Sequence, residues 1–484
     1  MLNETLLAAL GEILPPSALL TAAEDTRPYE CDGLTLFRAQ PLAVLLPENE
    51  AQVVEILKIC NAARLPVVAR GAGTGLSGGA TPNNDGVVLS LAKFKRILAI
   101  DPLARSAVLQ PGVRNLAISE AVAVHGLYYA PDPSSQIACT IGGNVAENSG
   151  GLHCLKYGLT VHNVRRVRAV LITGEIVEFG SDALDSAGYD LLALINGSEG
   201  LLAVTTEVTV RLTPKPREAK CILAAFDELA SAGQAVAAII AAGIIPAGLE
   251  MMDRLTISAV EPFVHAGYPL DAEAILLCEA DGTPEEVQAD IEEMRALLEE
   301  CGATRVEVSQ NEAQRLRLWS GRKAAFPAAG RVSPDYYCID GTIPRREIAP
   351  VLTRIAELGR EFGLRCMNVF HAGDGNLHPL ILFDANRPGD AEKTEAFGAK
   401  ILELCIEVGG TITGEHGVGL EKIGGMCVQF SSAELEWFHA IKHAFDDGGL
   451  LNPGKAVPAL YRCAEMGRMH VHRGQLPHPD LPRF

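Results

Sequence analysis

Residues 371–378 carry the first arrangement of side chains that could do chemistry. They read His-Ala-Gly-Asp-Gly-Asn-Leu-His and lie between two apolar runs, Val369–Phe370 and Pro379–Phe383. Glycine, aspartate and asparagine favour a tight turn, so we expect two strands joined here, with a histidine at each strand end. Two imidazoles that face one space are typical of a metal site.

A second polar cluster, Gly-Glu-His-Gly at 414–417, also lies between apolar stretches. We predict that His371, His378 and Glu415 bind a divalent metal, zinc or manganese, and leave one position open for substrate. His416 would remain as a base. Each residue alone is more simply a turn histidine or a capping carboxylate, whereas the whole set favours a site.

Length and composition limit the class of protein. With 484 residues the chain is too long for one core, and 47 glycines with 48% hydrophobic residues suit an enzyme of mixed helices and strands. The net charge of −19 argues against a nucleic-acid partner. The 12 cysteines include no Cys-x-x-Cys, which disfavours an iron–sulfur cluster or zinc ribbon in this chain.

Targeting signals are not expected. The N-terminus carries Glu4 and Glu12 and has no basic region typical of a signal peptide. The longest apolar run, 235–249, contains Pro246 and is too short to span a bilayer. Free thiols at this density indicate a reducing compartment, so we predict a cytoplasmic protein.

A glycine-rich loop at 70–79 follows a buried strand at 66–69 and includes a G-x-G-x-x-G pattern. In a dinucleotide-binding unit such a pattern opens a helix. Here residues 79–86 cannot form a helix, and a strand at 87–90 comes next. We therefore reject a nicotinamide site and expect backbone N–H groups of the loop to cradle phosphates, in preference to a plain surface turn.

Other elements must position these segments. An amphipathic helix begins at Glu50, and alternating apolar residues predict a long strand over 202–212. Small residues at 130–135 and 140–151 indicate close approach of backbone to a ligand, and residues 196–200 lead into the long strand. After the linker at 214–216, strand-like and helical stretches alternate, which predicts an α+β cap.

These motifs together resemble a known family. The segments 70–75, 140–151 and 197–200 look like the FAD domain of the vanillyl-alcohol-oxidase (PCMH) type, and the resemblance runs from about residue 40 to 458. Residues 371–378 and 414–417 are similar to the branch that oxidises D-2-hydroxy acids. That branch includes D-lactate and D-2-hydroxyglutarate dehydrogenases and the flavin subunit of bacterial glycolate oxidases.

The resemblance implies the fold class and its limits. We expect an α+β protein with a two-subdomain FAD-binding domain and an antiparallel-sheet cap that covers the flavin. The implied segments are a helical lead-in at 1–40, the FAD domain at 41–216, the cap with the metal site at 217–425, a returning segment at 426–458 and a tail at 459–484.

The resemblance also implies which residues contact the FAD. These positions are Arg70, Gly71, Ala72, Gly73, Thr74, Gly75, Pro131, Asp132, Thr140, Gly142, Gly143, Asn148, Gly151, Glu199 and Asn452. Flavoproteins with histidyl-FAD often have a histidine in the loop after the arginine, and here that position is Thr74. We therefore predict non-covalent FAD.

The implied reaction is the oxidation of glycolate to glyoxylate, or of D-lactate to pyruvate, with hydride transfer to the flavin. His416 would take the hydroxyl proton and Arg322 would pair with the substrate carboxylate; a solvated helix charge is the simpler alternative for Arg322. Asp374 is a candidate acceptor for a ligand histidine. The hydroxyglutarate enzymes carry a lysine near the position of Cys338, and this lysine helps to hold the distal carboxylate of their substrate. A cysteine cannot do so, which favours a small substrate.

Partners are implied by the resemblance alone. They are an iron–sulfur subunit and a second flavin-fold subunit, with electrons ending in quinone and with peripheral attachment at the inner membrane through these subunits. Three alternatives compete with this interpretation. A metal-dependent hydrolase without flavin would leave both glycine-rich regions without a purpose, and a non-catalytic assembly subunit would be expected to lose the histidine and glutamate set that is present here. A D-lactate dehydrogenase that acts alone is not excluded by the sequence.

Overall fold

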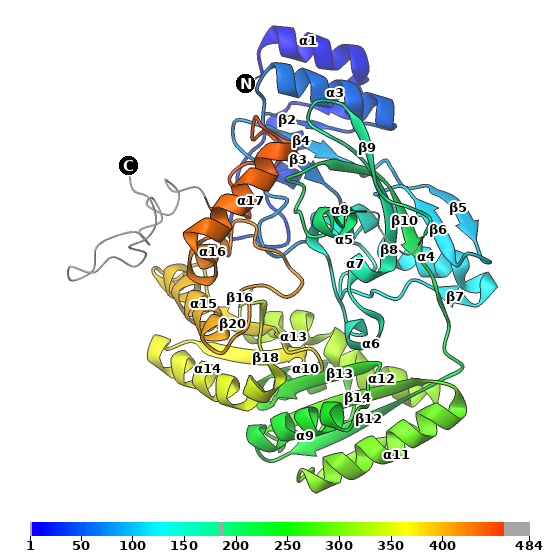
Figure 1. The fold of residues 1–484 in the computed structure, drawn as a ribbon. Helices are drawn as coiled ribbons and strands as arrows, with labels where there is room; N and C mark the ends of the chain where they lie inside the picture. The colour runs from blue at the N-terminus through cyan, green and yellow to red at the C-terminus, as the bar shows by residue number, and fades with distance from the viewer. Residues whose placement is uncertain (1, 184–187, 459–484) are drawn as a thin grey trace. The chain divides into compact units, whose positions relative to one another are not determined.

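The computed structural model describes residues 2–183 and 188–458, so the predicted tail at 459–484 lies outside the described residues. The chain forms two compact units, which are described separately below (Figure 1). Unit 1 contains the chain up to Ser149, Leu159–Pro214 and the chain from Glu415, whereas unit 2 contains Gly150–Gly158 and Lys215–Gly414.

The first sheet of unit 1 holds the glycine-rich loop. Its strand order is β1-β2-β4-β3, and β4 pairs in parallel with both β2 and β3. Residues 71–86 between β3 and β4 contain no helix, as expected from the sequence. The elements of this part are α1 (Glu4–Ile13), β1 (Leu19–Leu20), α2 (Ala23–Thr26), β2 (Ala43–Leu45), α3 (Glu50–Ala62), β3 (Val67–Arg70) and β4 (Val87–Ser90).

The second sheet of unit 1 is antiparallel, with strand order β5-β6-β10-β8-β9. On β10 the alternate residues Val204, Thr206, Val208 and Val210 are buried, as the alternation predicts. Its elements are β5 (Ile97–Asp101), β6 (Ser106–Leu109), α4 (Asn115–Val122), α5 (Ile141–Glu147), α7 (Thr160–Asn163), β8 (Val164–Val170), β9 (Ile176–Gly180), α8 (Leu191–Ile195) and β10 (Val204–Arg211). The short strands β7 (Leu127–Tyr128) and β11 (Thr213–Pro214) pair with each other.

The end of the described chain returns to the first sheet of unit 1. Helices α16 (Ile423–Gln429) and α17 (Ser432–Phe445) precede Leu451, which forms a parallel bridge with Val67 of β3. The backbone N–H of Asn452 also donates to the Val67 carbonyl at 2.8 Å. The segment after α17 is therefore fixed beside the strand that leads into the glycine-rich loop.

Unit 2 is built on an antiparallel nine-stranded sheet. Strands β15, β12, β14, β13 and β18 follow one another across it, and β20 joins β18 to β16. The strands are β12 (Glu218–Phe226), β13 (Gly248–Asp253), β14 (Ala274–Gly282), β15 (Arg305–Val308), β16 (Asp335–Cys338), β17 (Gly341–Thr342), β18 (Arg365–His371), β19 (Asn376–Leu377) and β20 (Pro379–Phe383). The turn predicted at 371–378 joins β18 to β19 and β20.

Helices cover both faces of this sheet. The helices of unit 2 are α6 (Cys154–Tyr157), α9 (Leu229–Ala241), α10 (Arg254–Val264), α11 (Pro284–Glu300), α12 (Glu312–Lys323), α13 (Ala325–Val332), α14 (Ile348–Phe362) and α15 (Asp390–Glu407). One face packs on α10, α12 and α13 in a single apolar core that includes Met252, Leu277 and Val369. Because side chains alternate along a strand, Glu250, Glu279 and His371 belong to this same face.

Within residues 2–183 and 188–458, no helix has both the length and the apolar composition that crossing a bilayer requires.

Candidate active site

In unit 1 the glycine-rich loop lies against the start of α5. A Cβ atom on Gly71 would come within 2.3 Å of Thr140 Oγ1, so only glycine fits there. The Thr140 hydroxyl is buried and has no hydrogen-bond partner among the described residues. A buried hydroxyl of this kind requires a partner, and a bound cofactor is the expected one. The structure thus brings the predicted residues 70–75 and 140–143 together.

Arg70 shapes the loop from inside. Its guanidinium is buried and donates to the carbonyls of Cys31 at 2.8 Å and Ala80 at 3.2 Å. It packs so close to Gly73, whose φ is +69°, that a Cβ atom there would meet it. Thr74 and Gly75 are half-buried, and Ala72 is exposed. Arg70 therefore supports the loop conformation, and the loop backbone is the accessible part.

Asp32 contacts the end of this loop from a distant part of the chain and was not predicted from the sequence. Its carboxylate accepts from the backbone N–H groups of Leu34 at 3.0 Å and Ala80 at 3.3 Å. Burial raises the pKa of Asp32, although these hydrogen bonds and the nearby charges of Lys455 and Arg70 oppose that rise. No sequence motif marks Asp32, because it lies far from the loop in the chain.

Glu199 and Asn452 hold backbone segments in place. Both oxygens of Glu199 accept backbone N–H groups, from Val418 and from Gly419, each at 2.7 Å. Asn452 Nδ2 donates to the carbonyls of Gly79 at 3.0 Å and Glu199 at 2.7 Å. These residues, predicted to contact FAD, thus fix the end of the glycine-rich loop and the chain just after His416.

A second buried carboxylate, Glu147, lies beside Glu199. A Cβ atom on Gly417 would lie 2.3 Å from Glu147 Oε2 and 3.0 Å from Glu199 Oε1, so both carboxylates flank this glycine. Burial raises the pKa of Glu147 well above its usual value, and the charge of Glu199 raises it further. Burial likewise raises the pKa of Glu199.

The remaining residues predicted to contact FAD are more scattered. The Pro131 carbonyl accepts from Asn115 Nδ2 at 3.1 Å, and Asn115 also bonds Asn144 of α5, which places Pro131 and Asp132 near that helix. Gly142 packs on Pro111 in the first turn of α5. Asn148 ends α5 in a left-handed conformation with φ +51°. Gly151 belongs to unit 2 and is not part of this group.

In unit 2 the structure brings His371 and His378 together, as predicted. His371 ends β18 and His378 precedes β20, and their ring centroids are 5.0 Å apart with the rings edge to face. A ring nitrogen of each lies within 4.8 Å of the other. Both residues are buried, with 4% and 2% of the whole residue exposed. Two neutral ring nitrogens at this spacing fit a metal such as zinc.

The acceptor for His371 is Glu250 of β13. His371 Nδ1 lies 2.7 Å from Glu250 Oε1. The sequence analysis proposed Asp374 for this role, but the Asp374 carboxylate accepts the Asn376 N–H within the turn, and Glu250 occupies the position at His371 Nδ1. The reason is register, because Glu250 pairs directly with His371 across β13 and β18.

Arg322 is not a solvated helix charge. It is 1% exposed, and its Nε donates to Glu250 Oε2 at 2.6 Å. Its Nη1 is buried without a hydrogen-bond partner among the described residues. A buried guanidinium with an unused donor is suited to bind an anion such as a carboxylate.

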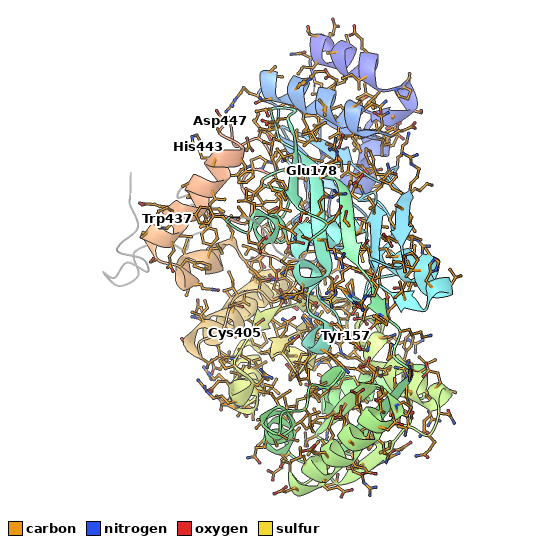
Figure 2. The ribbon with its side chains drawn as sticks, turned by 45° about the vertical axis from the view of Figure 1, so that its right-hand side comes forward. Tyr157, Glu178, Cys405, Trp437, His443 and Asp447 are labelled. Carbon is orange, nitrogen blue, oxygen red and sulfur yellow. The ribbon has the colours of Figure 1, made fainter. Side chains whose placement is uncertain are left out.

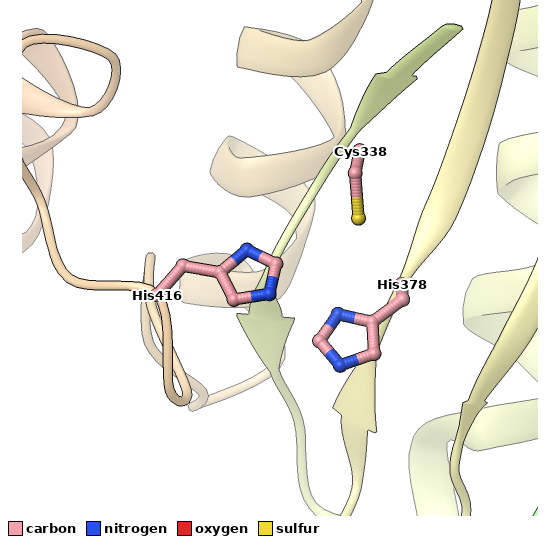
Figure 3. Close-up of side chains that lie close together, drawn as sticks. All are labelled: Cys338, His378 and His416. Carbon is pink, nitrogen blue, oxygen red and sulfur yellow. The ribbon is translucent and has the colours of Figure 1, made fainter. Parts of the chain in front are cut away.

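Cys338 ends β16, next to β20, and its sulfur lies within 4.8 Å of a ring nitrogen of His378. Both side chains are drawn in Figure 3. Because Cys338 is buried and has no cationic group, it offers no positive partner for a second carboxylate on a substrate.

Asp340 ties the histidine turn to the segment that leads to Glu415. Its carboxylate accepts from Asn376 Nδ2 at 2.8 Å and from the Gly414 N–H at 3.1 Å, and it is fully buried. Glu415 and His416 follow Gly414 directly in the chain, and they open the last segment of unit 1. The structure places both side chains as half-buried.

A second histidine, glutamate and arginine also meet in unit 2. Glu279 of β14 lies 3.3 Å from His153 Nε2 and accepts from Arg315 Nη1 of α12 at 2.7 Å and from Trp319 Nε1. Beside them, Asp281 accepts from Lys156 Nζ at 2.6 Å and from the Tyr157 hydroxyl at 2.7 Å. Tyr157 is labelled in Figure 2. These bonds hold residues 150–158 on the sheet.

Sequence reasoning missed Glu250, Asp340 and Glu279. One signal was available for Glu250 and Glu279, because each is a carboxylate inside an otherwise apolar strand, Gly248–Asp253 or Ala274–Gly282. A carboxylate in a buried strand needs a charged or hydrogen-bonding partner. The identity of that partner depends on strand register and on helix packing.

Both halves of the chain match known protein families. Residues 41–180 match the family described as FAD binding domain, and residues 215–456 match FAD linked oxidases, C-terminal domain. The glycolate oxidase subunit GlcD of Escherichia coli K12 is 62% identical over 480 residues, which is 99% of this chain and 96% of that protein. GlcD of Bacillus subtilis is 41% identical over 88% of this chain and 91% of its own length.

A D-lactate dehydrogenase of Anaerostipes hadrus is 33% identical, covering 91% of this chain and 95% of that protein. Among solved structures, p-cresol methylhydroxylase with bound substrate has a TM-score of 0.80 at 17% identity, covering 94% of this chain and 97% of that one. The 4-ethylphenol oxidase of Gulosibacter chungangensis has a TM-score of 0.77 at 17% identity, covering 95% and 98%. The predicted fold class is confirmed, and the chain belongs to the family of FAD-linked oxidases.

Proposed function

We propose that this protein oxidises glycolate to glyoxylate as an FAD-dependent dehydrogenase. The observation that carries the proposal is the buried pair His371–His378 beside Arg322, whose unused donor suits a carboxylate. The relatives named glycolate oxidase subunit GlcD, which match almost the full chain, support the same substrate. The hydrolase alternative leaves the FAD-binding match unexplained.

We propose that His371, His378 and Glu415 hold a divalent metal, zinc or manganese. The donor set supports this, because the two ring nitrogens are buried and close, and His371 Nδ1 meets a carboxylate. Glu415 follows Gly414, whose N–H is fixed by the carboxylate that also holds Asn376 inside the histidine turn. A metal bound there would stabilise charge on the substrate alcohol oxygen.

We propose that FAD binds without a covalent bond, at the loop 70–75 and the start of α5. The support is the glycine cradle with the orphaned Thr140 hydroxyl and the presence of Thr74 where histidyl-flavoproteins often carry histidine. Bound FAD would supply the hydride acceptor. A yellow pellet after precipitation with trichloroacetic acid would contradict this arrangement, because only covalent flavin stays with the denatured chain.

The chain's own residues then have separate tasks. Arg322 binds the substrate carboxylate through its free nitrogen and thereby orients the hydroxyl-bearing carbon. His416 accepts the hydroxyl proton on a ring nitrogen. Cys338 is buried and has no cationic group, so a second carboxylate on the substrate would find no positive partner there. The substrate is therefore a small 2-hydroxy acid.

D-Lactate is the second candidate substrate, although the D-lactate dehydrogenase relative is more distant, at 33% identity against 62% for the glycolate oxidase subunit. We further propose that the protein works inside a complex, since its relatives are named as subunits. An iron–sulfur subunit and a second flavin-fold subunit would pass electrons to quinone and would hold this cytoplasmic chain at the inner membrane. Co-purification of the chain at native expression levels tests this part of the proposal.

The deciding experiment is the anaerobic visible absorbance spectrum of the purified chain before and after addition of glycolate. We expect an oxidised-flavin band that bleaches with glycolate, and with D-lactate at a different rate. A folded protein without that band would overturn the flavin assignment. A band that bleaches only with D-lactate would show that D-lactate is the substrate and glycolate is not.

A further inference from the structure

The register of two strands in unit 2 places a glutamate directly opposite a predicted metal ligand. Strands β13 and β18 are antiparallel, and Glu250 pairs with His371 directly across them. Residues paired in this way share one face of the sheet, with Cβ atoms about 5 Å apart. Helix α12 covers that face and brings Arg322 to the same place.

Both oxygens of the Glu250 carboxylate have a partner. Oε1 of Glu250 meets His371 Nδ1 at 2.7 Å, and Oε2 accepts from Arg322 Nε at 2.6 Å. A guanidinium can only donate and a carboxylate can only accept. In the neutral imidazole the proton therefore lies on Nδ1, and Nε2 keeps the lone pair that a metal needs.

All three side chains are buried. The side chains of Glu250 and Arg322 are each 1% exposed, and that of His371 is 6% exposed. Water cannot replace a lost acceptor at this depth. A change in the Glu250 carboxylate therefore alters the hydrogen bonds of both His371 and Arg322.

We propose that Glu250 is a positioning residue that sets the proton of His371 and the orientation of Arg322 with one carboxylate. It thereby links the affinity for the metal to the affinity for the substrate carboxylate. This inference rests on the proposed function, in which His371 binds the metal and Arg322 binds the substrate.

The substitution Glu250→Gln separates this role from mere shape. Glutamine has the same size but offers one acceptor oxygen and one donor nitrogen. Either His371 Nδ1–H or Arg322 Nε–H must then face an amide N–H. If it is His371, the ring loses its acceptor and is driven to carry its proton on Nε2, which is the nitrogen that binds the metal.

The matched control is Glu279→Gln. Glu279 is a buried glutamate on the neighbouring strand that also meets a histidine and an α12 arginine, but its histidine is not a predicted ligand. The full-length flavoprotein and both variants are stripped of metal and titrated with Zn²⁺ against a chromophoric chelator. KM and kcat for glycolate are measured on the same samples.

For E250Q we expect Zn²⁺ affinity to fall about 10- to 100-fold, together with a higher KM, while E279Q keeps the wild-type Zn²⁺ affinity. Thermal unfolding shows whether each variant is folded. The ring ¹⁵N shifts of His371 in metal-free protein give a separate readout, with Nδ1 protonated in the wild type and the Nε2-protonated form increased in E250Q.

The outcomes distinguish two failures. If the wild type binds no stoichiometric Zn²⁺, the proposed metal site is wrong, and the ¹⁵N shifts still test the hydrogen bond itself. If the wild type binds Zn²⁺ and E250Q binds it equally well with an unchanged His371 tautomer, the inference about Glu250 is overturned while the proposed function stands. Should E250Q not fold, E250D, which keeps two acceptor oxygens on a shorter side chain, takes its place with an intermediate loss of affinity expected.

Discussion

Two groups of histidine, glutamate and arginine lie on the same face of the unit 2 sheet. They differ in whether the arginine keeps a hydrogen-bond donor without a partner. One is Arg322–Glu250–His371 and the other is Arg315–Glu279–His153. Both arginines come from α12, seven positions apart, which is about two helical turns. Both glutamates come from adjacent strands.

The difference lies in hydrogen-bonding capacity and in burial. Arg315 spends its other nitrogens on Glu312, and Glu279 also accepts from Trp319. Arg322, in contrast, keeps a buried Nη1 without a partner among the described residues. The group Arg315–Glu279–His153 thus serves as a structural clasp, in which each arginine nitrogen has a hydrogen bond. The group Arg322–Glu250–His371 is a candidate binding site, in which one arginine nitrogen has no partner among the described residues.

Removal of the proposed metal is expected to have the largest effect that separates the two groups. We expect a chelator to lower kcat/KM for glycolate by about a thousandfold, because a bound cation contributes several kcal/mol to such a barrier. Zn²⁺ or Mn²⁺ should restore the activity. Hydrogen exchange should rise in the turn 371–378 and stay constant in residues 150–158, and equal changes in both segments would break the comparison.

The next effect is on stability, at the clasp. Replacing Glu279 by alanine leaves His153 and Trp319 Nε1 without their carboxylate, while Arg315 keeps only Glu312. A buried polar group that loses its partner costs about 1–3 kcal/mol. Urea unfolding measures this loss. Activity per folded molecule should stay near that of the wild type, and a selective loss of activity would mean that this group is also functional.

A smaller effect concerns the arginines. Arg322→Lys keeps the charge but lacks the second nitrogen needed to hold Glu250 and a substrate carboxylate together, so we expect KM for glycolate to rise about 10- to 100-fold. Arg315→Lys is the matched control and should leave KM unchanged. Steady-state kinetics on both variants checks this, and equal KM values would remove Arg322 from substrate binding.

The smallest effect is the pH dependence of the clasp. Burial raises the pKa of Glu279, but the hydrogen bond with His153 and the charges of His153 and Arg315 outweigh it, and the net pKa is lowered. A carboxyl with a lowered folded pKa stabilises the protein above its unfolded value of 4.5 and loses this contribution as pH falls through the folded pKa.

The stability difference between the wild type and E279Q should therefore shrink, by on the order of 1 kcal/mol, as pH falls from neutrality to below 4.5. Urea unfolding at a series of pH values measures it. A difference that stays constant would show that the pKa of Glu279 is the same in the folded and unfolded states.

Local sequence was enough for several features. The glycine-rich loop between two strands and the histidine turn at 371–378 were predictable, because each depends on neighbouring residues and on the short-range rules for turns. The burial of alternate residues on β10 follows from the period of a strand. Family motifs added the FAD-binding fold, which the comparisons confirm.

Tertiary structure decided which groups meet those residues. Asp374 is close to His371 in the chain, but Glu250, which is 121 positions away, meets its Nδ1 because of the register of β13 with β18. Likewise, Arg322 is buried because α12 packs on that face of the sheet. A turn is set by contacts within a few residues, whereas the partner of a buried charge is set by pairing between distant strands, which no local pattern encodes.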